Sequence, residues 1–262
     1  MKNHADTMIF RLRSGMEISM IRLILVAIFL LLVFIASAIL FPLEWIIGKF
    51  NKHAKDISSL RIIQWVFKVI LFLSGVKTTV KGIENIPKDE PVLFIGNHRG
   101  IFDVLVSYSR MPDLTGFVAK KEMDKVPIIR RWMKHLYCLF LDRKNMKEGL
   151  KTILSAIDHI NNGISIVIFP EGTRNKGDGL LPFHAGSFKI AEKTNCKIIP
   201  MVQTKTEYIF ENQFPCIKAT KTTLEFGKPI VLDELDKNDR KDIANYTRNI
   251  IRQMYESNNK LV

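Results

Sequence analysis

The sequence predicts an α/β protein in which helices pack on the faces of a sheet, preceded by an N-terminal helical pair that docks on a membrane. Two observations carry this prediction. From Lys77 onward, short apolar runs alternate with amphipathic stretches, as strands alternate with helices in such folds. Before that point, the run from Leu23 to Phe41 has no charged residue and is long enough to span a hydrocarbon core as a helix.

Composition sets the outer bounds. The chain has 262 residues, of which 47% are apolar, so it can bury a substantial core in one large domain with an appendage. A formal net charge of +13 favours anionic partners such as acidic lipids or phosphorylated substrates. The three cysteines, Cys138, Cys196 and Cys216, lack paired spacing, so we expect neither a disulfide framework nor a metal site.

The N-terminal region divides into a basic tail over residues 1–22 and a two-helix segment over residues 23–76. We expect the tail to be loose or partly helical. Glu44 and Trp45 follow the apolar run, where an interfacial anchor would sit. The sequence Ala36-Ser37-Ala38 resembles a signal-peptide cleavage site, but the apolar run is too long for a signal peptide and continues past it. A soluble core helix is disfavoured because the run has no polar face.

A polar connector over residues 49–61 leads to a second, shorter apolar segment, Ile62 to Val76. Its length is below a comfortable span, so we expect an interfacial or re-entrant helix paired with the first. The α/β domain then occupies residues 77–262. On this division, removing residues 1–76 should release the α/β domain into solution and lower its activity on membrane substrates.

The alternating pattern places the elements of the α/β domain. A short strand and turn are expected at residues 78–82. Further strands are expected at residues 92–96, 115–119, 137–141, 164–169, 197–203 and 221–227. Helices are expected at residues 101–110, 127–136, 145–161, 185–195 and 238–257.

Polar side chains gather where the strand at residues 92–96 ends. The apolar run stops at Asn97-His98, and Asp103 lies one turn into the next helix. A carboxylate bonded to one imidazole nitrogen fixes the tautomer and makes the other nitrogen a better base. The pair therefore indicates a general base, although such pairs also serve as helix caps or surface hydrogen bonds.

Other strand ends also carry charge. Phe169 to Arg174 reads FPEGTR, in which Arg174 could grip a phosphate through its planar fork. The alternative is a Pro-Glu-Gly turn with an incidental ion pair. Arg143 follows the strand that ends at Leu141, and Lys120 follows another. In Ile198 to Met201, we expect the proline to interrupt a buried strand.

These pieces together resemble one family. Asn97-His98 with Asp103 matches the NHxxxxD motif of glycerolipid acyltransferases, and FPEGTR matches that family's third motif letter for letter. Leu139 to Arg143 and Ile198 to Met201 are similar to its second and fourth motifs. The resemblance covers about residues 77–230. It implies a mixed sheet flanked by helices and places the chain near bacterial enzymes that acylate lysophosphatidic acid to phosphatidic acid.

The resemblance also implies roles. His98 would take the proton from the acceptor hydroxyl, and Asp103 would orient His98. The acceptor's phosphate would be held by Arg174 and Arg143, with Lys120 or Lys121 neutralising phosphate or oxyanion charge and with Glu171, Gly172 and Thr173 shaping the site. Transfer would be direct, and the sequence has no G-x-S-x-G elbow. No metal or redox cofactor is expected, and the donor would be acyl-CoA or an acyl carrier protein.

Three alternatives remain at this stage. The acceptor could be another lysophospholipid or a lyso-aminolipid. The chain could be a membrane lipid-binding protein that has lost catalysis, although the intact motif residues argue against this. A nucleic-acid partner is disfavoured because no basic–aromatic binding motif occurs. The expected location is a membrane, such as a bacterial inner membrane, with the catalytic domain on the cytoplasmic face.

Overall fold

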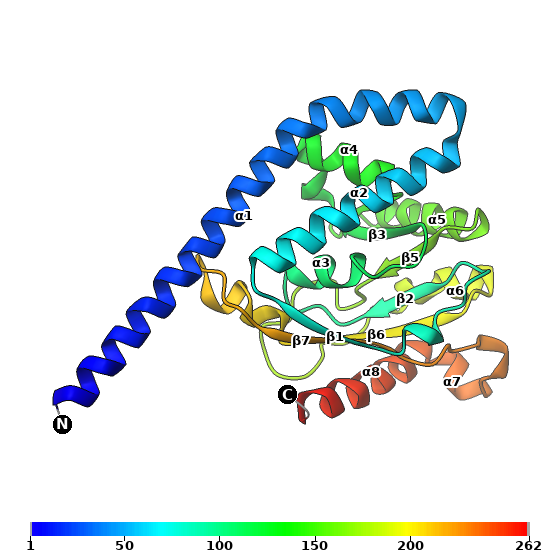
Figure 1. Cartoon of the computed structure of the whole chain (residues 1–262). Helices are drawn as coiled ribbons and strands as arrows, with labels where there is room; N and C mark the ends of the chain where they lie inside the picture. Colours follow the sequence, from blue (N-terminus) through cyan, green and yellow to red (C-terminus); the bar gives the residue numbers. More distant parts are fainter. Residues whose placement is uncertain (1, 261–262) are drawn as a thin grey trace.

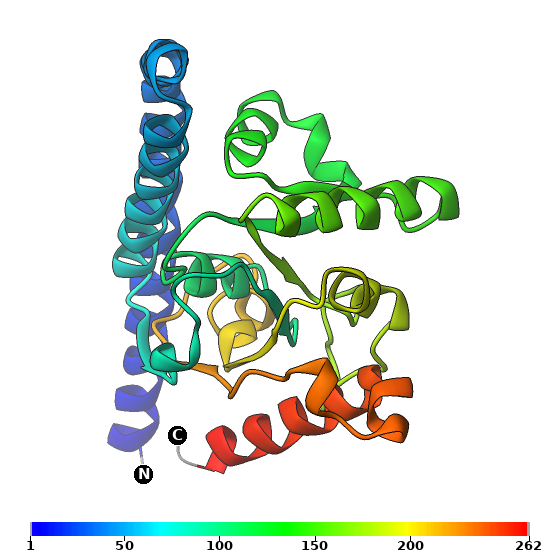
Figure 2. The same ribbon diagram turned by 90° about the vertical axis from the view of Figure 1, so that its right-hand side faces the viewer.

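The structure is a computed structural model that describes the backbone of residues 2–260 and side chains from Gly15 onward. Seven strands form one sheet, with helices on both faces (Figures 1 and 2). Along the sheet the order is β1-β7-β6-β2-β5-β3-β4. The strands are β1 (Lys77–Lys81), β2 (Leu93–Gly96), β3 (Thr115–Lys120), β4 (Leu139–Leu141), β5 (Ser165–Ile168), β6 (Ile198–Thr204) and β7 (Lys221–Phe226).

The sheet is mixed, as expected. Neighbouring strands run parallel except β6 and β7, which pair antiparallel. The central strands are buried on both faces, which explains why they read as apolar runs without alternation. In β2, for example, Leu93 and Ile95 face one core cluster while Phe94 faces the other. All seven strands lie at or within two residues of the expected ranges.

The two core clusters belong to two helical layers. The first layer contains α2 (Lys52–Leu73), α3 (Phe102–Tyr108) and α4 (Pro127–His135), with α1 (Lys2–Phe50) beyond them. The second contains α5 (Met146–Asn161), α6 (Lys189–Thr194) and α8 (Ile243–Lys260), with α7 (Lys237–Lys241) beside α8. Figure 2 shows the long α1–α2 pair on one side of the sheet and α5, α6 and α8 on the other.

Several expected boundaries are wrong. The region expected as one helix at residues 238–257 is split into α7 and α8 at Asp242. The region at residues 185–195 begins as a 3₁₀ turn and becomes α-helical only at Lys189. Pro200 does not interrupt β6, which continues through it and pairs Pro200 with Ile95 of β2.

The N-terminal helical pair is more regular than the sequence indicated. α1 runs without a break from Lys2 to Phe50, so the backbone of the tail is helical, and Pro42 lies inside the helix. The expected polar connector is also helical apart from Asn51, whose side chain caps α2 by accepting a hydrogen bond from the Ala54 N–H. The chain therefore reverses in a single residue, and α2 packs back against α1.

Over Gly15–Phe50, α1 is long and apolar enough to cross a membrane, and only 11% of its most apolar window is buried inside the protein. Large apolar side chains such as Leu32, Ile35 and Ile39 are therefore exposed along it. An exposed apolar surface of this extent needs a cover that water does not supply. The feature agrees with the expected membrane-docking helix.

α2 is part of the protein core. Leu60, Ile63 and Val66 are buried in the same cluster as Phe94 of β2. The buried Gln64 donates from Nε2 to the carbonyl oxygens at residues 108 and 111, at 3.3 and 2.7 Å, which ties α2 to the end of α3. The first core cluster is thus built jointly by the N-terminal pair and the α/β domain.

This shared core changes the expected result of truncation. Removing residues 1–76 would expose the apolar faces of the sheet and α3 that α2 covers, at about 25 cal/mol for each Å² uncovered. We expect the remaining chain to aggregate and to lack the cooperative thermal transition of the full chain in detergent. Size-exclusion chromatography and circular dichroism of the two proteins, purified in parallel, measure this. A monomeric truncated protein with full α/β structure would contradict it.

Candidate active site

The two polar loops predicted from the sequence meet at one edge of the sheet. β2 and β5 are parallel neighbours, with Ile95 beside Ile168, so their carboxyl ends lie together. The loops are joined directly. The His98 N–H donates to Glu171 Oε1 at 2.9 Å, and the Asn175 N–H donates to the His98 carbonyl oxygen at 2.8 Å. The edge where these strands end is the usual place for a site in an α/β sheet.

His98 and Asp103 form the predicted pair. His98 Nδ1 lies 2.8 Å from Asp103 Oδ2, and the Asp103 side chain is fully buried. The same oxygen accepts the backbone N–H groups of Arg99 and Gly100 at 2.6 and 2.8 Å, and Oδ1 accepts the Thr206 hydroxyl. Because the carboxylate serves only as an acceptor here, Nδ1 carries the hydrogen and Nε2 is the basic nitrogen.

The His98 ring is fixed but its basic nitrogen is open. The ring stacks on Phe169 at a centroid distance of 4.5 Å and an angle of 10°, and the side chain remains 17% exposed. Across residues 15–260, His98 Nε2 has no hydrogen-bond partner. A base must keep this lone pair available for a substrate hydroxyl, and the geometry provides it.

Asn97, which the sequence analysis left without a role, holds the loop to the sheet. Its fully buried amide donates to the Gln203 carbonyl oxygen and accepts the Gln203 N–H, both at 2.8 Å. Gln203 lies on β6, the strand beside β2. Asn97 therefore extends the sheet's hydrogen bonding past the end of β2 and sets where His98 begins.

Glu171 acts on the backbone in this structure. Its buried carboxylate accepts two backbone hydrogen bonds, from the His98 N–H at Oε1 and from the Leu181 N–H at Oε2, the latter at 2.9 Å. Burial raises the pKa of Glu171, while the two backbone N–H groups and the charges of His98 and Arg99 act to lower it. Within the described side chains no hydrogen bond or ion pair joins Glu171 to Arg174, so the incidental ion pair given as the alternative is absent. The role of Glu171 in shaping the site stays a prediction.

The rest of the FPEGTR loop faces outward. Gly172 has a φ of +70°, and a Cβ there would lie 3.1 Å from the His184 ring, so glycine suits this turn. Thr173 and Arg174 are exposed. Arg174 Nη1 donates to Glu211 Oε1 at 2.9 Å, and the same oxygen accepts the Ile101 N–H at 2.6 Å. Glu211 thus holds the guanidinium beside the His98 loop.

Three further cations lie at or just after the carboxyl ends of β3 and β4, at the same edge of the sheet, but form no hydrogen bonds with the His98 and FPEGTR loops in the described structure. Lys120 ends β3 and pairs with Glu122 at 3.2 Å, while Lys121 pairs with Asp142 at 2.9 Å. Arg143 follows β4 at the edge of the sheet, and partial desolvation lowers its pKa. Within the described side chains, none of the three bonds to His98 or Arg174.

Arg99 is a functional candidate that sequence reasoning missed. Its guanidinium is 8% exposed and donates from Nε and Nη2 to Glu207 Oε1 at 3.0 and 2.7 Å, and from Nη1 to the Gly177 carbonyl oxygen at 2.6 Å. Burial is the largest single influence on Arg99 and acts to lower its pKa, but the hydrogen bond to Glu207 and the electrostatic attraction to nearby groups, Glu207 first, together raise the pKa. Arg99 thereby ties the His98 loop to the loop after FPEGTR and to the turn that carries Thr206.

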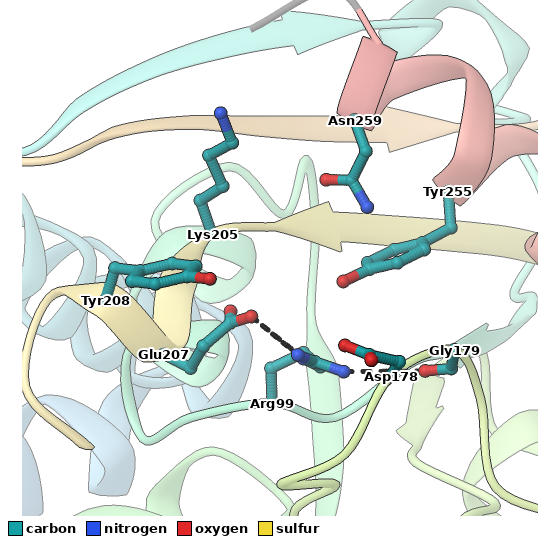
Figure 3. Close-up of a pocket in the computed structure, with 8 residues that line it drawn as sticks. All are labelled: Arg99, Asp178, Gly179, Lys205, Glu207, Tyr208, Tyr255 and Asn259. Atoms are coloured by element: carbon teal, nitrogen blue, oxygen red, sulfur yellow. Dashed lines mark hydrogen bonds and ion pairs between the residues drawn. The ribbon is translucent and has the colours of Figure 1, made fainter. Parts of the chain in front are cut away.

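Figure 3 shows this ion pair at the base of a cavity of about 340 Å³, with Tyr255 and Asn259 of α8 on one side and Tyr208 on the other. Among the cavity residues in the described structure, Arg99 alone bonds directly to the His98–Asp103 pair, through its backbone N–H to Asp103 Oδ2. No single motif signals the Arg99–Glu207 ion pair, because the two residues are more than 100 positions apart in the sequence. Only folding brings them together.

Comparisons with known proteins identify the family of this chain. The family model described as Acyltransferase matches residues 77–204. The chain is 32% identical over 206 residues to the 1-acyl-sn-glycerol-3-phosphate acyltransferase of Haemophilus influenzae, covering 75% of this chain and 82% of that protein. It is 34% identical over 143 residues to the Borreliella burgdorferi protein of the same name, covering 55% of this chain and 57% of that one.

The chain spans 57% of the Borreliella burgdorferi protein, 66% of a Saccharomyces cerevisiae relative and 55% of a Cocos nucifera relative. Among solved structures, it resembles the crystal structure of the 1-acyl-sn-glycerophosphate (LPA) acyltransferase from Thermotoga maritima. That match has a TM-score of 0.75 at 20% identity and covers 91% of this chain and 97% of the other, which shows a common fold. The chain therefore belongs to the acyltransferase family that includes the 1-acyl-sn-glycerol-3-phosphate acyltransferases.

Proposed function

We propose that this protein transfers a fatty acyl group from an acyl thioester to the free hydroxyl of lysophosphatidic acid, giving phosphatidic acid. One observation carries the proposal. A buried Asp103 bonds His98 Nδ1 and leaves Nε2 open, while Arg174 is held beside the same loop through Glu211. A base and an anion grip at one site suit an acceptor with both a hydroxyl and a phosphate.

The proposed reaction is a direct transfer. His98 Nε2 takes the hydroxyl proton as the acceptor oxygen attacks the thioester carbonyl. The tetrahedral intermediate then collapses, the carbon–sulfur bond breaks, and the imidazolium returns its proton to the leaving thiolate. Asp103 stabilises the charged imidazole during this exchange. The step needs no oxidant, metal or redox group, and its co-substrate would be acyl-CoA or an acyl carrier protein.

The cations supply the binding energy. Arg174 would grip the acceptor's phosphate through two N–H groups, with Arg143 and Lys120 or Lys121 adding positive charge from β3 and β4. Holding both reactants in place can lower the barrier by about 7–11 kcal/mol, which exceeds what a general base supplies. Accurate binding of the phosphate would therefore matter as much as the base.

The membrane supplies the acceptor in this proposal. The exposed apolar face of α1 supports a protein docked on a bilayer, where the acyl tail of the acceptor stays in lipid while its phosphate reaches Arg174. The net charge of +13 favours an anionic lipid surface. We place the catalytic domain on the cytoplasmic face, as in a bacterial inner membrane, where acyl thioesters are available.

Arg174→Ala should mainly weaken acceptor binding. Loss of a charged hydrogen bond to phosphate should raise the KM for lysophosphatidic acid about tenfold or more, with a smaller effect on kcat. The matched control is Arg240→Ala on α7, which removes an exposed arginine that pairs with Asp233. Steady-state kinetics of the three proteins measure this. Unchanged KM and kcat in the Arg174 variant would remove it from the phosphate site.

An acceptor panel tests the substrate. Purified protein would be offered lysophosphatidic acid, lysophosphatidylcholine or a lyso-aminolipid, each with acyl-CoA and acyl carrier protein donors in separate reactions. We expect acylation of lysophosphatidic acid at the highest kcat/KM, because it alone presents a phosphomonoester to the cations. Preference for a different lysolipid would assign the site to that acceptor, and binding without any acylation would indicate a lipid-binding protein.

A further inference from the structure

A second cavity, lined mainly by basic residues, lies at the turn between α1 and α2 and apart from the candidate active site. This turn is in the upper right of Figure 1. Its volume is about 380 Å³. Three helices line it, namely α1, α2 and α4, through Trp45, Gly48, Lys49, Lys52, Lys55, Arg131 and His135. The proposed acyl transfer uses none of these residues.

Three of the four cations that line this cavity form no ion pair with a carboxylate in the described part of the chain. The Lys49 ammonium lies 3.7 Å from the centre of the Trp45 ring, and the Arg131 guanidinium lies 4.3 Å from that of Phe41. Such contacts place a cation on an aromatic face and leave its charge in place. Within residues 15–260, neither these two nor Lys52 forms an ion pair with a carboxylate. Lys49, Lys52 and Arg131 therefore bring positive charge to the cavity without a carboxylate partner.

The nearby acidic groups are already engaged elsewhere. The buried Glu44 accepts hydrogen bonds from the Ser58 and Ser59 hydroxyls at 2.7 and 2.9 Å. Asp56 pairs with Lys55 at 3.3 Å and accepts the Tyr137 hydroxyl. Asp56 thus neutralises the fourth cation, Lys55, while Lys49, Lys52 and Arg131 remain available for a ligand.

His135 adds a polar wall without charge. Burial lowers its pKa, and the positive charges of Lys55 and Arg131 lower it further, against the opposing effect of Glu44 and Asp56. The imidazole is therefore neutral near pH 7. Its Nδ1 lies 3.4 Å from the Ser59 hydroxyl oxygen. Because that hydroxyl donates to Glu44, Nδ1 carries the hydrogen and Nε2 is an acceptor, so His135 shapes the wall without donating to a phosphate.

The cavity also sits beside the apolar surface of α1. Ile46, Ile47 and Phe50, in the same last turns of that helix, expose their side chains. A tryptophan and lysines at the end of an exposed apolar helix are typical of the boundary between hydrocarbon and headgroups. A phosphate bound in the cavity would therefore lie at the level of the lipid headgroups when α1 is embedded in a bilayer.

We propose that this cavity binds the phosphate headgroup of an anionic phospholipid that is neither substrate nor product, and so fixes the α1–α2 turn and α4 at the membrane surface. Lys52 and Arg131 approach from different helices, so one phosphate can be held from two sides. Arg131 offers the planar fork that suits phosphate oxygens. The lipid's acyl chains would lie along the exposed face of α1.

Native mass spectrometry of the full chain in detergent tests this site. The protein would be titrated with phosphatidylglycerol and with phosphatidylcholine of the same chains. We expect wild-type protein to prefer phosphatidylglycerol about tenfold or more, and Lys52→Gln/Arg131→Gln to lose that preference. The charge-matched control, Lys237→Gln/Lys241→Gln on the distant α7, should keep it, as should Lys52→Arg/Arg131→Lys.

Three results would overturn the proposal. Wild-type protein could show no preference for the anionic lipid. The α7 control could lose as much binding as the cavity variant, which would indicate diffuse attraction to net charge. Inorganic phosphate at a concentration comparable to the lipid could displace it, which would assign the cavity to soluble anions. Lys52 and Arg131 are exposed, so the glutamine variant and the Lys52→Arg/Arg131→Lys variant should both keep the wild-type melting temperature, which is measured on the same samples.

Discussion

His98→Ala should lower kcat at least a hundredfold while leaving the fold intact. Removing a positioned general base costs about 10²–10⁴ in rate, and His98 is the imidazole at this edge that bonds to the buried Asp103 carboxylate. Asp103 would keep its bonds to the Arg99 and Gly100 N–H groups and to Thr206, so the loop has reason to stay in place. Steady-state kinetics and a thermal melt of the same sample measure both quantities.

The comparison with Asp103→Asn sharpens this result. An amide at position 103 could donate to Nδ1 and favour the tautomer that has its proton on Nε2, so kcat should fall while KM changes little. Glu234→Gln, in an exposed turn away from the loop, is the matched control. Activity of His98→Ala within a few-fold of the wild type would remove the base from the mechanism.

Glu207→Ala should destabilise the protein by about 3 kcal/mol, because it leaves the Arg99 guanidinium buried with only carbonyl oxygens as partners. For a chain of this size, we expect the thermal midpoint in detergent to fall by about 6 °C or more. The loop that carries His98 should loosen as well, so kcat should fall. Differential scanning fluorimetry and kinetics on one preparation measure the two effects.

Two controls separate this ion pair from a general surface effect. Glu207→Gln keeps an oxygen for Arg99 and should lose less stability than Glu207→Ala. Glu234→Ala, which truncates an exposed glutamate, should change the free energy of unfolding by less than about 0.5 kcal/mol. If Glu207→Ala had the same thermal midpoint as the wild type, the burial of Arg99 would not depend on this carboxylate.

The sheet was predictable because its strands are locally encoded. Strands such as β2 and β5 are buried on both faces, so they appear as short apolar runs that end at polar loops. The strand order was not predictable, because no local pattern states that β6 lies between β2 and β7. The split between α7 and α8 at Asp242 was missed because α7 is wholly polar and no glycine or proline marks the break.

The N-terminal helices were predicted in kind but not in extent. An apolar run marks a membrane helix, but the polar residues on either side of it carry no signal that they extend the same helix. The role of α2 in the core was missed for a related reason. A polar side chain such as Gln64 does not signal burial, whereas the structure buries it against the backbone carbonyl oxygens at the end of α3.

The candidate site was only half readable. His98 and Asp103 are five positions apart, so the chain itself indicates their contact, and the structure places them 2.8 Å apart. Thr206, Glu207 and Glu211 follow β6, more than 100 positions from His98, and no motif points to them. These residues position the loop and the guanidinium, and tertiary structure alone brings them to the site.

The central claim is direct acylation of lysophosphatidic acid at the His98 site. The most direct measurement follows isotope-labelled lysophosphatidic acid and an acyl thioester with purified protein, quantifying released thiol and labelled lipid by mass spectrometry. We predict one labelled phosphatidic acid for each thiol released, with neither product formed by His98→Ala. Thiol release without labelled phosphatidic acid, or accumulation of an acylated protein on the way to product, would contradict the account.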